Sequence, residues 1–192
     1  FLFTEMELLS PAGNIEAAKA ALSAGADAIY IGTAFSARAY AGNFDEKELE
    51  EIIKTAHFLG RRVYVAVNIM ILEEEFKDAL EHLKGLYLLG ADAVIISDMG
   101  LFYAAQKCVP ELEMHISTQA GIHSKKGALL VKSLGAKRVV PARECTMEML
   151  KSIADCEIEV EAFCHGALCS GYSGACLMSS FIGGRSGNRG KC

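Results

Sequence analysis

Four times along the chain, a helical stretch ends at a glycine and a short apolar run follows. The four runs are AIYIG at 28–32, RVYVAVN at 62–68, AVIIS at 93–97 and RVVPAR at 138–143, preceded by Gly25, Gly60, Gly90 and Gly135. Glycine is a common helix stop because it takes the left-handed conformation at little cost. Short runs rich in Val and Ile are typical of buried parallel strands. Further strands expected at 7–9, 114–118 and 157–163 bring the number of helix–strand units to about seven.

Strands that alternate with helices predict a parallel sheet, either open and doubly wound or closed into a barrel. The first loop reads Ser10-Pro11-Ala12-Gly13-Asn14 and lacks the Gly-x-Gly-x-x-Gly that a dinucleotide-binding fold carries there. The short, even units therefore favour an α/β fold of the TIM-like (β/α) barrel type. A complete barrel takes about 250 residues. We expect a single barrel-type domain over residues 1–192 whose eighth unit is missing by truncation, in a fragment of a longer chain.

Composition narrows the class of protein. The 192 residues are 52% hydrophobic and 22% charged, which is typical of a globular domain rather than a disordered chain. No apolar stretch is long enough to span a membrane. Seven cysteines without a secretory signal favour a reducing compartment, so we expect a cytoplasmic protein. A net charge of -5 argues against a broadly basic nucleic-acid-coating protein, but a local basic site remains compatible with it.

Polar side chains gather where the expected strands end, the edge at which barrel enzymes carry their chemistry. The substrate-binding candidates at these ends are Arg38, Asn68, Asp98, Gln119 and Glu144. Arg38 and Arg143 suit an anionic cosubstrate or an RNA phosphate, because arginine binds such groups bidentately. Each polar residue has a structural alternative, since Asp98 in particular suits a helix N-cap.

The seventh expected strand alternates in an unusual way. With a period of two, Glu157, Glu159, Glu161 and His165 share one face, which must point into the barrel. A carboxylate near the top of the barrel is either paired or functional. We take Glu161, His165 and Arg143 as candidate catalytic residues. The alternative is a buried ion pair between Glu161 and Arg143.

A cysteine cluster in a Gly/Ser-rich segment is the most specific signal. The spacing Cys169-x6-Cys176-x15-Cys192 is wider than the zinc knuckle and fits an iron–sulfur cluster held by loops. Three thiolates leave a fourth ligand to be found, either Cys164 or a residue outside this chain. The cluster is therefore expected in the full-length protein, and its presence in these 192 residues alone is left open.

The same segment carries a resemblance. Glu161-Ala162-Phe163-Cys164-His165-Gly166-Ala167-Leu168-Cys169, followed by Gly174-Ala175-Cys176-Leu177-Met178-Ser179, resembles the signature of the collagenase-like peptidase family U32. Further matching segments are Glu7–Asn14, Phe35–Ala39, Ser97–Gly100, Pro141–Glu144 and Asn188–Cys192.

The resemblance implies a barrel in the N-terminal half of a longer protein. Several family members carry a four-cysteine [4Fe–4S] cluster and support hydroxylation of a tRNA uridine, a ribosomal RNA cytidine or the ubiquinone ring without molecular oxygen. On matching positions, Cys169, Cys176 and Cys192 would be three metal ligands, with the fourth beyond residue 192. Position 164 is usually aliphatic in the family, so Cys164 departs from its pattern.

Three functions stay open at this point. The first is an iron–sulfur enzyme that hydroxylates a tRNA or rRNA base. The second is the peptidase or collagenase of the family's older label, built for example on zinc held by His115 and His165 or on a Cys169–His165 pair. The third is a non-catalytic subunit that binds substrate or a partner protein. The sequence does not predict the oligomeric state.

Overall fold

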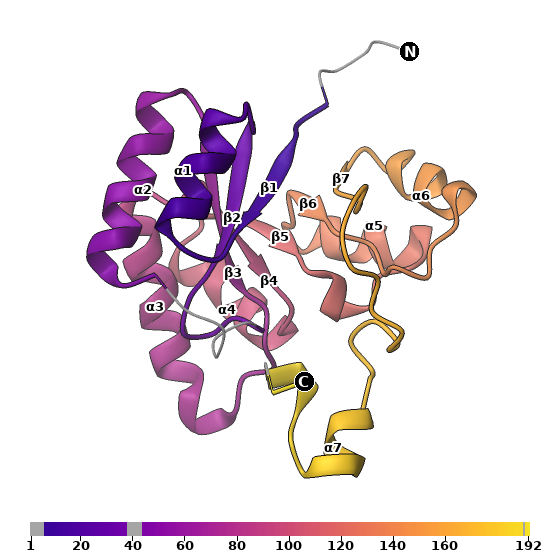
Figure 1. Cartoon of the computed structure of the whole chain (residues 1–192). Coiled ribbons are helices and arrows are strands. Elements are labelled where there is room, and N and C mark those ends of the chain that lie inside the picture. Colours follow the sequence, from indigo (N-terminus) through magenta and orange to yellow (C-terminus); the bar gives the residue numbers. More distant parts are fainter. Residues whose placement is uncertain (1–5, 38–43, 190) are drawn as a thin grey trace.

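The computed structural model describes residues 6–37, 44–189 and 191–192, and in these ranges it forms one seven-stranded sheet. All strand pairs are parallel, and each strand pairs with the next one along the chain. The strands are β1 (Leu9–Ala12), β2 (Ala28–Gly32), β3 (Arg62–Val67), β4 (Ala93–Ile96), β5 (Glu113–Ile116), β6 (Arg138–Val139) and β7 (Glu159–Val160). The sheet curls into an open half-barrel (Figure 1). The predicted incomplete α/β barrel of about seven units is confirmed.

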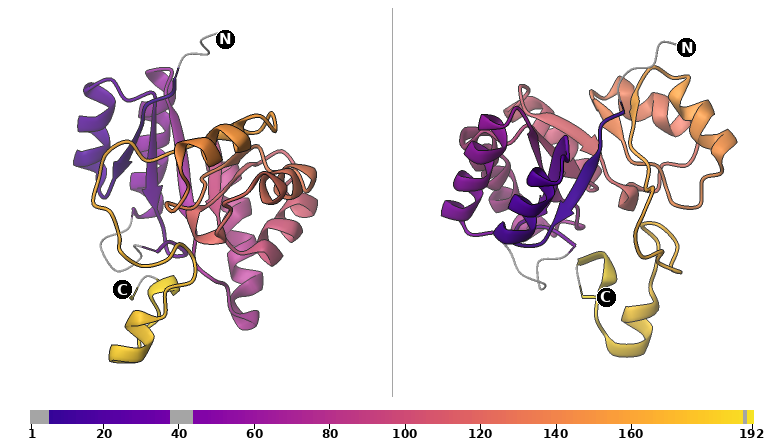
Figure 2. Two further views of the ribbon diagram at one scale, coloured as in Figure 1. Left: turned by 90° about the vertical axis from the view of Figure 1, so that its right-hand side faces the viewer. Right: turned by 45° about the horizontal axis from the view of Figure 1, so that its top comes forward.

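Helices cover the outer face of the curled sheet (Figure 2). They are α1 (Ile15–Ser23), α2 (Glu46–Phe58), α3 (Phe76–Leu89), α4 (Met99–Cys108), α5 (Lys125–Ser133) and α6 (Met147–Ala154). The remaining helix, α7 (Met178–Gly183), lies apart from the sheet in the segment after β7 (Figure 1), and the 3-10 turns are η1 (Glu73–Glu75), η2 (Thr118–Ala120) and η3 (Gly187–Arg189). Several of these helices begin at an N-cap residue whose side chain accepts a hydrogen bond from a backbone N–H of the first turn. On α2, Asp45 and Glu48 form a full capping box. No helix in the described residues is long and apolar enough to cross a membrane.

The four glycines that preceded the apolar runs stop their helices as expected. Gly25, Gly60, Gly90 and Gly135 have φ angles of 99°, 68°, 90° and 102°. This left-handed conformation strains any residue with a Cβ, so the chain can reverse there at little cost only with glycine.

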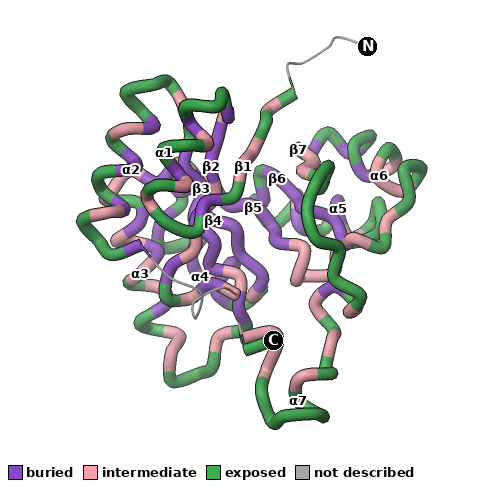
Figure 3. Tube along the Cα trace, viewed as in Figure 1, coloured by how far each residue is buried: buried purple, intermediate pink, exposed green. Residues whose placement is uncertain are grey.

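One apolar layer lies on each side of the sheet. The outer layer joins strands to helices and includes Ile29, Val65, Ile96 and Phe102, all fully buried. A smaller inner layer is built from Ala28, Tyr64, Ala93, Ile95 and Val140. Burial is therefore concentrated on the strands, whereas the chain after β7 is mostly exposed (Figure 3).

Strand ends differ from the expectation at three places. The first strand was expected at 7–9 and begins only at Leu9. The carbonyl of Leu8 accepts from the N–H groups of Asp27 and Ala28, and the N–H of Leu8 donates to the Asp27 carboxylate instead of to a backbone carbonyl. The sixth and seventh strands were expected at 138–143 and 157–163, but each pairs over two residues. Pro141 has no N–H to donate, which ends β6 early.

Candidate functional site

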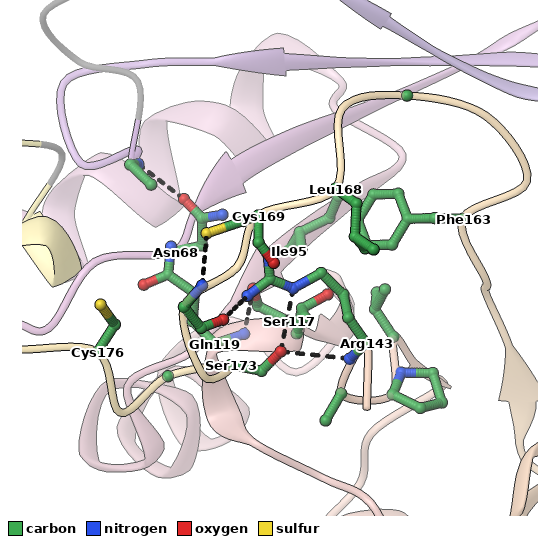
Figure 4. A pocket seen from close by; sticks show the side chains of 18 of the residues that line it. Asn68, Ile95, Ser117, Gln119, Arg143, Phe163, Leu168, Cys169, Ser173 and Cys176 are labelled. Atoms are coloured by element: carbon green, nitrogen blue, oxygen red, sulfur yellow. Dashed lines mark hydrogen bonds between the residues drawn. The ribbon is translucent and has the colours of Figure 1, made fainter. Parts of the chain in front are cut away.

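The carboxyl ends of the strands surround a cavity of about 660 Å³. Five predicted site residues line it, namely Asn68, Gln119, Arg143, Glu161 and His165. The three cysteines Cys169, Cys176 and Cys192 line it as well. They come from the segment that follows β7 and crosses the carboxyl ends of the strands (Figures 1 and 4). The structure thus brings eight of the eleven predicted site residues to one cavity.

Two predicted residues, Asp98 and Glu144, lie away from the cavity, and Arg38 falls outside the described residues. Asp98 caps α4, because its carboxylate accepts from the N–H groups of Leu101 at 2.9 Å and Ile71 at 3.2 Å. Glu144 accepts from the N–H of Ser173 at 2.9 Å. Asp98 and Glu144 therefore bind this protein's own backbone, and neither lines the cavity.

Glu161 faces the barrel interior as predicted, but its partner is not the one expected. Arg138 donates to Glu161 at 3.5 Å and to Glu7 and Glu159 at 2.8 Å each. The Arg138 side chain is 9% exposed and that of Glu161 is 17% exposed. The alternative of a buried ion pair for Glu161 is thus confirmed, but its partner is Arg138 and not Arg143, because the β6–β7 register sets Arg138 opposite Glu159 and leaves Arg143 above the strand end.

An interior polar network surrounds this ion-pair cluster. The hydroxyl of Tyr64 donates to Glu7 at 2.8 Å, and burial raises the pKa of Tyr64 to about 12. His115 packs edge-on against the Tyr64 ring, and its Nε2 lies 3.0 Å from a carboxylate oxygen of Glu113. His115 is fully buried within the described structure and does not line the cavity. The zinc site suggested for His115 and His165 therefore gains no support from the described residues.

Burial raises the pKa of Glu161, although the Arg138 charge opposes this effect. A carboxyl group with a raised folded-state pKa stabilises the fold at pH values below its unfolded pKa, near 4.3 for glutamate. That stability is lost as the pH rises through the folded pKa. The Glu161→Gln variant lacks this loss, so its stability relative to the parent should increase from pH 4 to pH 7. Urea unfolding at several pH values measures the difference, and a constant difference would contradict the expected pKa shift.

Arg143 lies against the loop that carries the first cysteine (Figure 4). Its Nε donates to Ser173 Oγ at 3.1 Å, one terminal nitrogen donates to Gly171 O at 2.8 Å, and the other donates to Cys169 O at 3.5 Å. The Arg143 guanidinium, followed by the N–H of Gly171, holds the pKa of the Cys169 thiol below its ordinary value. The thiolate is the form that binds metals.

The cysteine side chains were tested for their fit to an iron–sulfur cluster. A Cβ at Gly171 would lie 2.9 Å from Cys176 Sγ and 3.5 Å from Cys169 Sγ, so the two sulfurs flank a space that only glycine leaves open. Cys192 lies on the wall of the same cavity. Within the described ranges no three His, Cys, Asp or Glu groups already gather as a metal site. The donor chemistry and the space beside Gly171 fit thiolate ligation by Cys169 and Cys176, with Cys192 as a third candidate.

Gly174 packs directly against the barrel rim. Its φ is 73°, and an added Cβ would meet the backbone oxygen of Gln119 at 2.1 Å. The Gly174→Ala variant should therefore detach the loop over 169–176, with hydrogen exchange there rising about tenfold or more. Gly60→Ala is the matched control, because Gly60 has a similar φ of 68° with nothing within 4 Å. Equal loop exchange in the two variants would show that backbone strain, not the contact with Gln119, decides the outcome.

The family model of peptidase family U32 matches residues 13–192. This chain belongs to peptidase family U32. The tRNA hydroxylation protein P of Helicobacter pylori J99 is 40% identical over 98% of this chain, and the match covers 46% of that protein. The 23S rRNA 5-hydroxycytidine synthase of Escherichia coli K12 is 38% identical over 97% of this chain and 28% of that protein.

A solved structure agrees with the fold of this U32 member. The U32 peptidase Mk0906 superposes with a TM-score of 0.67 at 18% identity, over 82% of this chain and 68% of that one. At 18% identity, this structural similarity establishes the barrel fold and no shared activity. The chain spans less than half the length of the two curated relatives named above.

Sequence reasoning on this U32 member missed residues that complete the site. Arg138 was taken as part of an apolar strand, although a charged residue at an inward position of β6 is a signal that period-two counting could have found. Glu7 was expected to be part of a strand and instead binds Arg138 from just before β1. Ser173 is buried and receives two hydrogen bonds from Arg143, and no sequence pattern pointed to it.

Proposed function

We propose that this chain forms the barrel part of an enzyme that hydroxylates a base of tRNA or ribosomal RNA. The enzyme would depend on an iron–sulfur cluster, with Cys169, Cys176 and Cys192 as ligands, and would not use molecular oxygen. Such an enzyme would work in the cytoplasm. The proposed activity is that of a whole protein. The two relatives named above are more than twice as long as this chain.

One observation carries the proposal. Cys169 and Cys176 converge beside Gly171 on the wall of a cavity at the carboxyl edge of the barrel. The chain is also about two-fifths identical to relatives named for tRNA hydroxylation and 5-hydroxycytidine synthesis. A thiolate pair beside a ligand-sized cavity supports redox chemistry on a bound substrate better than it supports peptide hydrolysis.

The residues of this chain would bind and orient the base. Enzymes that modify a base take it out of its stack into a pocket and read its edge by hydrogen bonds. Asn68 is held by the Ala37 N–H at 2.8 Å and presents the rest of its amide to the cavity, and Gln119 lines the same wall. Phe163 and Tyr172 also line the cavity and are about 60% exposed, so an aromatic face is available for stacking.

The cluster, when bound, would activate an oxygen donor other than O2 and carry electrons from the base to that donor, because hydroxylation of a C–H position is a two-electron oxidation. Glu161 would act from the cavity wall as a proton-exchanging group, because burial raises the pKa of its carboxyl group, although the ion pair with Arg138 opposes this effect. Glu161→Gln should keep the cluster and lower turnover, since it keeps the shape and removes the ionisable proton.

The test uses the full protein produced without oxygen. We expect bound iron and sulfide, visible charge-transfer absorbance, and a hydroxylated pyrimidine in RNA from anaerobic cells, detected by nucleoside mass spectrometry. Cells lacking the protein should lose that nucleoside. A colourless protein that cleaves peptides and leaves RNA unmodified would overturn the proposal and favour the peptidase of the family's description.

A further inference from the structure

Two arginines attach the cysteine-bearing segment to the barrel at separate places. We call residues 169–192 the cysteine arm. Arg143, just after β6, holds its first part, and Arg189, within the arm, holds its last part against the β3–α3 connection. The attachments lie on opposite sides of the cavity that the cysteines line.

The first attachment is a complete set of hydrogen bonds. All three guanidinium nitrogens of Arg143 donate to oxygens of the arm, on Cys169, Gly171 and Ser173. The backbone N–H of Arg143 also donates to Ser173 Oγ at 3.2 Å. The adjacent Glu144 accepts the Ser173 N–H at 2.9 Å. Ser173 is 4% exposed, so its part of the contact is shielded from solvent, whereas Cys169 and Glu144 are exposed. Arg143 is therefore occupied by the protein itself, in place of the anionic cosubstrate that was expected.

The second attachment is a bidentate ion pair. Arg189 donates to both carboxylate oxygens of Glu75, at 2.8 and 2.5 Å, and to the carbonyl of Met70 at 2.7 Å. The N–H of Met70 donates back to Asn188 O at 3.4 Å. Both side chains of the ion pair are less than a third exposed. A two-bond arginine–carboxylate contact fixes orientation as well as distance.

Apart from the close contact of Gly174 with Gln119, the described residues of the arm have little other support between these attachments. α7 contributes no buried residue, and Phe181 and Ile182 are 86% and 79% exposed. Its outer position is visible in Figure 3. The locations of the thiols are thus determined by the two arginine contacts more than by apolar packing.

We propose that Arg143 and Arg189 are positioning residues that hold the cysteine arm over the barrel before a cluster is bound. Arg143 sets Cys169 and Cys176 on the β6 side of the cavity, and Arg189 sets Cys192 on the β3 side. The inference rests on the proposed function for the identity of the cluster. The attachment itself is a property of the metal-free protein and can be tested without the cluster.

The test compares variants of the full protein after its metal has been removed. In Arg143→Gln, hydrogen exchange over 169–176 should rise about tenfold or more, since several hydrogen bonds to a charged group are lost. Arg143→Lys should give an intermediate rise, because an ammonium group lacks the planar fork that reaches three oxygens. In Arg189→Gln the rise should be confined to 187–192. Arg185→Gln is the control within the arm, because its guanidinium makes no hydrogen bond among the described residues.

Cluster reconstitution gives a second readout. Both attachment variants should bind less than half the iron and sulfide of the parent under matched conditions, whereas Arg185→Gln should match the parent. Unchanged exchange in Arg143→Gln and Arg189→Gln would overturn the inference, whatever the iron content. Raised exchange together with undiminished cluster content would also overturn it, since the arm would then be held by the cluster alone. A parent protein that binds no iron would instead overturn the proposed function, and the exchange result would still decide the attachment.

Discussion

Alanine at position 169, 176 or 192 is expected to remove bound iron and RNA hydroxylation together. In the proposed enzyme, Cys169 and Cys176 would supply two ligands beside Gly171, and Cys192 would supply a third from the same cavity wall. Loss of one thiolate leaves an iron exposed and the cluster prone to oxidative breakdown. We expect less than a tenth of the parent's iron and no detectable hydroxylated nucleoside, as measured by metal analysis and RNA mass spectrometry.

Cys108→Ala provides the matched control. Cys108 is the last residue of α4, is exposed, and does not line the cavity. Its replacement should leave both iron content and hydroxylation unchanged. Full activity in Cys169→Ala, Cys176→Ala and Cys192→Ala would exclude a cluster ligated by these thiols and would favour the hydrolase alternative.

Replacement of Arg138 by methionine is expected to cause the largest loss of stability in the barrel. Arg138 binds the carboxylates of Glu7, Glu159 and Glu161. Burial alone would lower the pKa of Arg138, but its hydrogen bonds to Glu7 and Glu159 raise that pKa overall. Without the guanidinium, three carboxylates face one another in a poorly hydrated interior. Removal of one partner from a buried ion pair costs about 3 to 5 kcal/mol. We expect about 3 kcal/mol here, because Glu159 is partly exposed.

Lys137→Met tests the neighbouring charge on the same carboxylate. Lys137 lies 3.3 Å from Glu159, but its side chain is 56% exposed. An exposed ion pair contributes about 0 to 1 kcal/mol, so this variant should unfold at nearly the parent's urea midpoint. Similar losses in the two variants would show that local charge balance, rather than the buried Arg138 contacts, stabilises this end of the barrel.

The sequence predicted the features that depend on local pattern. The seven strands follow from apolar runs and the helix stops from glycines, because both are set by neighbours along the chain. The gathering of Cys169, Cys176 and Cys192 at one cavity could also be predicted, since barrel loops converge at the carboxyl edge.

The contacts of individual side chains could not be predicted in this way. The partner of Glu161 depends on the register between β6 and β7, which sets Arg138 opposite Glu159. The role of Arg143 depends on how the loop over 169–174 folds back, and nothing near Arg143 in the chain encodes that path. The roles of Asp98 and Glu144 were ambiguous in the sequence, because a carboxylate can accept a hydrogen bond from a backbone N–H group as readily as it can bind a substrate.

The order of strands in the sheet has a consequence for how the protein forms during synthesis. Because β1 to β7 pair in the order in which they are translated, each new strand finds its template already in place. The barrel can therefore be assembled vectorially on the ribosome, one helix–strand unit at a time, and it need not wait for a distant segment. Contacts that span most of the chain, such as Arg138 with Glu7 and Arg189 with Glu75, close last. A nascent chain would thus acquire its scaffold before Cys169, Cys176 and Cys192 emerge, and these three thiols would meet iron only on a folded surface.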